Sequence, residues 1–186
     1  MKGAIDTGRL KPNTGRTNQK LFFAKLQLER ISQLLVAKDT FSWEAEALSC
    51  REAAILHLHG AYVAFLQELV RFYKLNGELL ASEDVRVAMA ARGQVAPEIT
   101  VLQQLEQQPA SWLAALLRAH ALCLIAPDPQ PADAPEDEPE GLGRAISLVS
   151  VADDAPLSAG DLDAVAGWQR ELVAIIREFR SERVEF

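Results

Sequence analysis

Three polar residues on the apolar side of a predicted long helix are the side chains best suited to chemistry in this sequence. The segment 40–75 repeats apolar residues with a helical period, and Arg51, Glu52 and His59 lie on or beside its apolar stripe. An ion pair beside an imidazole can orient a ligand or tune a general base, because burial and nearby charge shift the pKa of His and Glu. The trio equally fits a structural polar cluster that sets the register between helices, so no catalytic residue is assigned. The residues predicted on the opposite, polar face are Glu46, His57, Glu68 and Arg71.

Side chains that ligate metals occur in two helical segments. Cys50 and His57 share the 40–75 helix, and His120 and Cys123 share a later one, so a Cys2His2 zinc site can be drawn. The alternative is four separate side chains, because Cys50 and His57 fall on the polar side of their helix. The sequence also lacks the Glu-x-x-His pairs of di-iron bundles, the glycine-rich phosphate loops and the nucleophile-elbow motif. We therefore predict no metal and no cofactor.

The run Arg51-Glu52-Ala-Ala-Ile-Leu-His57 resembles the Arg-x4-6-His motif of HEPN domains, which are four-helix bundles and in several families dimeric RNases. The resemblance implies that Arg51 and His57 would form a catalytic pair, with Glu52 beside it, acting on RNA across a dimer interface. Helical geometry places Arg51 and His57 about 120° apart around the helix axis. A chain with a net charge of −7 also attracts RNA poorly.

Four substantial helices are predicted from the periodicity and from their end signals. The first runs from an N-cap at Thr17 to about Lys38, and the 40–75 helix follows a tight link, so the two should form a hairpin. A third begins near Pro109 and is apolar on nearly every side, so we expect it to be the most buried helix. The last begins at a capping box at Ser158.

The predicted fold class is all-α, a four-helix bundle with short connecting helices and one extended segment. The short helices open at Ser82 and Pro97. The extended segment is Ile146–Val151, whose apolar residues would lie as a strap across the helices; the alternative is that it pairs with the same segment of another chain.

The expected domain organisation is a flexible basic arm, residues 1–16, followed by one helical bundle domain, residues 17–186. Residues 127–143 are predicted to be a mobile loop, because Asp128 to Glu140 holds six acidic residues and the loop is rich in proline. That acidic loop is interpreted as a solvated linker, with a lure for a basic partner as the alternative.

Charge and cysteine content limit the classes of partner. The first 38 residues carry eight Lys or Arg against Asp6 and Glu29, so the remainder of this −7 chain is strongly acidic. We therefore do not expect nucleic acid as a partner. The two cysteines fit small buried side chains in a reducing compartment, and the first twenty residues lack an apolar signal region. We expect a cytoplasmic protein that has no membrane association.

The stretches RTNQKLFFAKLQLE and SCREAAILHLHGAYVAFLQELVRFY resemble an uncharacterised all-helical protein family found in pseudomonads. The resemblance covers most of the chain from Arg16 onward and implies a bacterial protein without a family activity to transfer. The function expected is a non-enzymatic interaction or regulatory module, with an unidentified protein or a second copy of the chain as its partner. The alternative is a HEPN-like RNase or a small-ligand-binding bundle, which would show a well-formed pocket at Arg51, Glu52 and His59.

Overall fold

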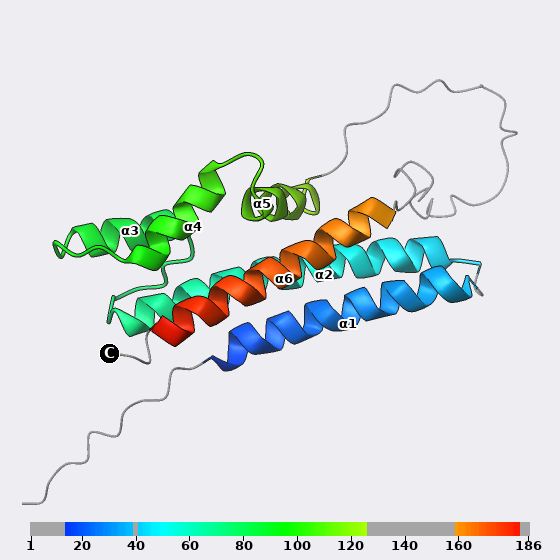
Figure 1. Ribbon diagram of the computed structural model, residues 1–186, viewed down its shortest axis with the longest axis horizontal. Coiled ribbons are helices and arrows are strands. Elements are labelled where there is room, and N and C mark those ends of the chain that lie inside the picture. The colour runs from blue at the N-terminus through cyan, green and yellow to red at the C-terminus, as the bar shows by residue number, and fades with distance from the viewer. Residues whose placement is uncertain (1–13, 39–40, 126–158, 183–186) are drawn as a thin grey trace, which may run out of the picture.

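The computed structural model describes residues 14–38, 41–125 and 159–182 of the chain. Every regular element within those ranges is a helix, which confirms the all-α prediction (Figure 1). The six helices are α1 (Gly15–Ala37), α2 (Trp43–Phe72), α3 (Ser82–Ala90), α4 (Pro97–Gln107), α5 (Trp112–Leu122) and α6 (Ala159–Glu182).

The core is built around α2. Its buried side chains Ala54, Leu58, Phe65 and Leu69 repeat at helical spacing, and α2 packs on α1, α3, α5 and α6. Each fully buried Leu or Phe contributes about 1.5–3 kcal/mol of transfer free energy, so this stripe supplies much of the stability. Because α1 and α2 pack along their length as a hairpin, the predicted pairing of the first two helices is confirmed.

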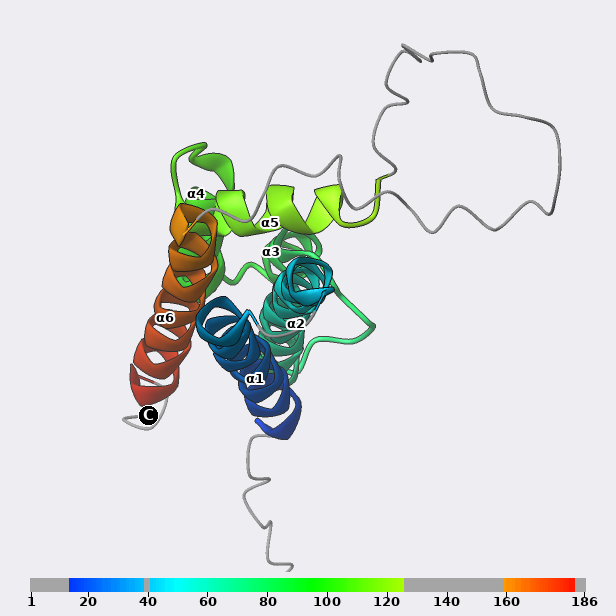
Figure 2. The ribbon, with the colours of Figure 1, turned by 90° about the vertical axis from the view of Figure 1, so that its right-hand side faces the viewer.

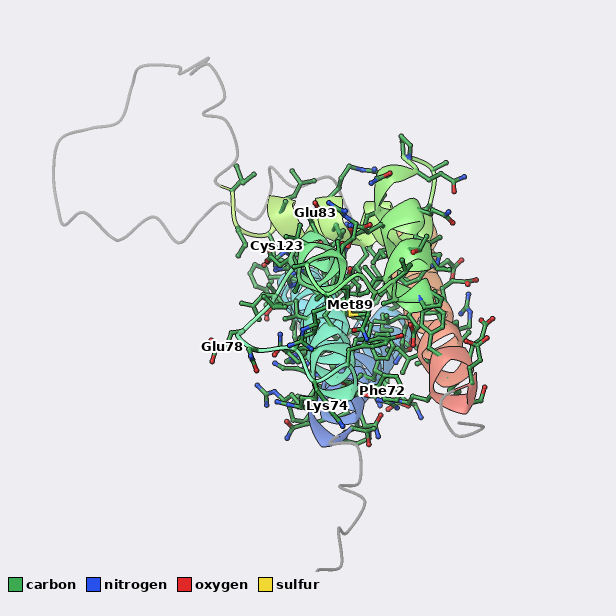
Figure 3. All side chains as sticks on the ribbon, turned by 90° about the vertical axis from the view of Figure 1, so that its left-hand side faces the viewer. Phe72, Lys74, Glu78, Glu83, Met89 and Cys123 are labelled. Carbon is green, nitrogen blue, oxygen red and sulfur yellow. The ribbon has the colours of Figure 1, made fainter. Side chains whose placement is uncertain are left out.

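The long helices α1, α2 and α6 run side by side, and α6 is antiparallel to α1 (Figure 1). Figures 1 and 2 together show α5 crossing over these helices instead of lying along them. The finer expectation of a four-helix bundle is therefore not confirmed. Met89 of α3 is buried in the same core as α2, and Figure 3 shows it in the interior between the helices.

The helix α5 is not the most buried helix, which corrects the sequence prediction. Its buried residues are Leu113, Ala114 and Leu116, whereas Leu122 is 71% exposed. The reason is geometric, because an 11-residue helix that crosses its neighbours can bury only the side that meets them. Pro109 precedes this helix by three positions, and the hydroxyl of Ser111 caps it by accepting a hydrogen bond from the Ala114 amide at 3.0 Å.

Glu68 is buried and ion-paired, although the helical wheel placed it on the polar face of α2. Its carboxylate accepts hydrogen bonds from Arg180 Nε at 3.1 Å and Arg180 Nη2 at 2.8 Å, and another from the Thr17 hydroxyl. Arg180 also donates to Asn18 Oδ1 at 3.0 Å. Thr17 therefore ties α1 to α2 instead of capping α1, which begins at Gly15. The wheel failed because the whole side of α2 that faces α1 and α6 is covered.

The segment between α2 and α3 leaves the end of α2 through backbone turns. Lys74 has φ +53° and Gly77 has φ +98°, a left-handed conformation that glycine adopts at little cost. Arg92 donates to the carbonyls of Tyr73 and Lys74 at 3.3 and 3.0 Å, which satisfies acceptors at the end of α2. Figure 3 shows Glu78 on this segment, projecting away from the helices.

Several sequence predictions concern residues outside the described ranges. These are the basic arm as far as residue 13, the link at residues 39–40, the whole acidic loop at 127–143, the extended segment Ile146–Val151 and the cap at Ser158.

Candidate functional site

A surface hollow lies along α2 and is called the α2 trough here. It encloses about 530 Å³ between the start of α1, the outward side of α2 and the segment after α2. Arg16 and Lys20 form one wall, Leu80 forms the other, and the floor and ends are lined by His59, Gly60, Val63, Ala64 and Gln67.

Small residues and one hydrogen bond give the α2 trough its shape. A Cβ at Gly60 would meet Cδ and Cε of Lys20 at 3.4 Å, so the stem of Lys20 lies directly across the glycine. Gln67 donates its side-chain amide to the Leu79 carbonyl, which holds the outer segment beside α2. Figure 2 shows that segment standing out from α2 between α2 and α3. The trough is therefore a consequence of a glycine on α2 and a tethered connecting segment.

The α1 wall of the trough is basic. Arg16 is fixed by a hydrogen bond from its Nη1 to Gln19 Oε1 at 2.7 Å, and Lys20 has no carboxylate partner among the described residues. The neighbouring His57 ring packs on Phe23 with ring centroids 5.3 Å apart. Burial lowers the pKa of His57, and the charges of Lys20 and Arg16 lower it further. The wall thus offers two cations beside a neutral imidazole.

A smaller hollow of about 260 Å³ adjoins the trough and shares His59 and Leu80 with it. Its carboxylates are already engaged. Glu106 accepts from the Tyr62 hydroxyl and, at 2.6 Å, from Ser82 Oγ. Burial raises the pKa of Tyr62, and the bond to Glu106 raises it further, so this phenol stays protonated.

Glu83 lines the same hollow and is held by two other side chains. Its Oε2 accepts from Arg86 Nε at 2.7 Å and from Gln103 at 2.8 Å. These bonds hold the pKa of Glu83 at about 2, well below its usual value. Because Glu83 and Glu106 each already have donors, neither is a free base for an incoming substrate.

His59 is the residue at which the two hollows meet. Its ring stacks on His120 of α5, with centroids 3.6 Å apart and an interplanar angle of 14°. Burial lowers the pKa of His59 to about 4, and the neighbouring His120 contributes to the shift. At neutral pH His59 is therefore an uncharged ring that joins α2 to α5.

The predicted trio of Arg51, Glu52 and His59 does not converge on one site. Arg51 is half-buried with its Nε unpaired, Glu52 is exposed, and the structure shows no ion pair between them. Both charges act on Cys123 at the end of α5, whose pKa is raised by burial and by Glu52 and lowered by Arg51. His59 lies about two helical turns further along α2, against His120.

The residues of the HEPN-like pair and those of the possible zinc site do not come together either. His57 packs against α1 through Phe23, whereas Arg51 influences Cys123 of α5, so the two residues face different helices. Burial raises the pKa of Cys50, Glu46 raises it further, and Arg30 of α1 lowers it. Cys50 packs beside Ile31 and Leu34 of α1, whereas Cys123 packs against the main core cluster. Within the described ranges, no three His, Cys, Asp or Glu side chains gather closely enough to hold a metal ion.

The sequence profile of a family of unknown function, DUF6586, matches residues 12–186. The chain belongs to this family. That finding confirms the expected membership of an uncharacterised family. No curated protein and no solved structure matches the DUF6586 chain.

The α2 trough was missed in the sequence because two of its walls come from outside α2. One signal was nevertheless present in the sequence. Ala53, Leu56, Gly60, Val63 and Gln67 alternate at spacings of three and four, which is the pattern of a helix seam. This stripe was not predicted as a binding surface because Gly60 and Gln67 interrupt its run of apolar residues.

Proposed function

We propose that this DUF6586 protein is a non-enzymatic interaction module of the bacterial cytoplasm, and that it binds a protein partner along the α2 trough. The observation that carries the proposal is the seam of small and apolar residues on the outward side of α2. Gly60 and Val63 line the trough, and Leu56, one turn earlier on the same side, is 41% exposed. A partly exposed stripe with this spacing is a surface on which helices pack against one another.

The chemistry of the hollows favours binding over catalysis. An enzyme site needs polar groups that are free to act on a substrate, arranged in a concave pocket. In this protein Glu83 and Glu106 are engaged by neighbouring side chains, and His59 is stacked on His120. The remaining lining of the trough is small, apolar or cationic, which suits recognition of a surface.

The proposal of a protein without membrane association is supported by the way α2 packs in the fold. Among the described residues α2 alone is long and apolar enough to cross a membrane, and 56% of its most apolar window is buried inside the fold. A core helix of a water-soluble bundle has the same composition, because its apolar side chains face other helices.

Site-specific photo-crosslinking in the source bacterium tests the proposal. A photoreactive amino acid in place of Leu56 should give a discrete protein adduct, whereas the same residue in place of Val87, 52% exposed on α3, should not. Adding Gly60→Leu, which fills the floor of the trough, should remove the adduct. Equal adducts from both positions, or an adduct that persists after Gly60→Leu, would contradict the proposed function.

A further inference from the structure

The shape of the α2 seam indicates what kind of segment covers it. Residues at spacings of three and four lie along one side of a helix, and such a stripe is complementary to the apolar stripe of a second helix. The Lys20 stem lies across Gly60, so the room for an incoming side chain lies between that stem and Leu80, over Val63 and Ala64. An extended strand would need unpaired backbone groups at the edge of the site, and a helical surface has none to offer.

The α1 wall indicates the charge of that segment. Arg16 and Lys20 are four positions apart on α1, so they present two cations about one helical turn apart along the trough. The Lys20 stem is positioned by its contact with Gly60, and its ammonium has no described carboxylate to neutralise it. The nearby His57 ring carries no negative charge that could compensate them. The carboxylate of Glu68 is ion-paired with Arg180 and is therefore already neutralised.

From these two features we propose that the α2 trough binds an amphipathic helix of a partner protein that carries Glu or Asp along one flank, at one-turn spacing. This inference rests on the proposed function and adds the chemistry of the partner to it. The partner's apolar stripe lies on Leu56, Gly60 and Val63, and its acidic flank meets Arg16 and Lys20. Complementary charge fixes the orientation of the bound helix and excludes basic segments.

Two other occupants fit these observations less well. A second copy packed antiparallel through the same seam brings the Arg16 and Lys20 walls of both copies to one rim, where like charges repel. RNA carries the required negative charge, but the trough floor is apolar and the net charge of the chain is −7.

The test uses the full chain and two synthetic stapled helices of about three heptads, which differ only in the charge of one flank. Both carry Leu and Ala on the apolar stripe, and one has Glu on the flank where the other has Lys. Fluorescence anisotropy in low salt should show the Glu helix binding at least about tenfold more tightly than the Lys helix, because two close charge pairs change from attraction to repulsion. Raising the salt concentration should weaken binding of the Glu helix.

Variants connect the binding to the trough. Charge reversal at both wall residues, Arg16→Glu with Lys20→Glu, should weaken the Glu helix about tenfold and strengthen the Lys helix. Arg170→Glu with Arg177→Glu on the exposed side of α6 is the matched control and should change neither affinity beyond the loss of general charge attraction. Gly60→Leu should abolish binding of both the Glu helix and the Lys helix. Circular dichroism should show that this variant remains helical.

The outcomes separate the inference from the proposed function. Failure of both helices to bind overturns both. Equal binding of the two helices, or a Glu-helix affinity that the wall reversal leaves unchanged, overturns the acidic partner and leaves a helix-binding seam. Concentration-dependent dimerisation that Gly60→Leu abolishes would identify a second copy as the occupant, and tighter binding of a single-stranded RNA would identify nucleic acid. Either result would also overturn the inference.

Discussion

Removing Arg180 should destabilise the fold more than neutralising its partner Glu68. The Glu68 side chain is only 3% exposed, whereas that of Arg180 is 24% exposed. Arg180→Met deletes two hydrogen bonds to Glu68 and one to Asn18, and it strands a buried carboxylate with only the Thr17 hydroxyl. Stranding a buried charge costs about 3–5 kcal/mol. Glu68→Gln leaves an arginine that keeps Asn18 and reaches water, so its cost should be about 1.5–3 kcal/mol.

Urea unfolding at fixed pH measures both costs, and the double variant Glu68→Gln with Arg180→Met completes the cycle. Because the double variant leaves no stranded charge, it should be more stable than Arg180→Met alone by about 2 kcal/mol. The reasoning is refuted if the two single variants agree within about 0.5 kcal/mol, or if the double variant loses the sum of both. Unchanged slopes of unfolding free energy against urea would show that only the native contacts were altered.

Three further outcomes are expected. Gly60→Ala should stabilise the protein by about 0.5–1 kcal/mol in urea unfolding, since helix propensity rises and the new methyl group meets only a flexible side chain at 3.4 Å; a loss of stability would contradict this. Burial against His120 lowers the pKa of His59 to about 4, so the unfolded chain binds this proton first and stability should fall between pH 6.5 and 4. His59→Gln should flatten that pH profile of urea midpoints, and an unchanged profile would show that another group titrates. Glu106→Leu should cost about 1–3 kcal/mol in thermal unfolding because it leaves the Tyr62 hydroxyl buried without its acceptor, whereas no loss would mean that water replaces the carboxylate.

The elements that depend on local sequence were the ones that could be predicted. The periodicity of residues 43–72 is contained within one segment, and Pro97 opens α4 where a proline at a first helical turn is expected. The predicted helix ends were less accurate, because the long helix ends at Phe72 and not at Leu75. Beyond that end, Arg92 from a later turn donates hydrogen bonds to the carbonyls of Tyr73 and Lys74. Local patterns therefore define which segments are helical, and neighbouring segments decide where they stop.

The candidate site could be predicted only in part, because its contacts join distant positions. Glu68 was placed on a polar face, and its partner Arg180 is 112 positions away in the sequence. His59 was grouped with Arg51 and Glu52 on or beside the apolar stripe of α2, whereas the structure stacks its ring on that of His120. A helical wheel shows which residues share a side of one helix and carries no information about what covers that side.

The hydrogen bond from Arg180 to Asn18 also means that the start of α1 lies next to the end of α6. Asn18 is in the first turn of α1 and Arg180 in the last turn of α6. Figure 1 shows the start of α1 and the end of α6 at the same end of the described helices. A circular permutant that starts with α6, continues through a short linker into α1 and ends after α5 would keep every helix-to-helix contact described. In such a chain α6 would be synthesised first, directly before the hairpin on which it packs, and residues 126–158 would no longer connect two helices. Whether α6 docks as an independent unit would then be readable from the order in which the helices gain protection during refolding.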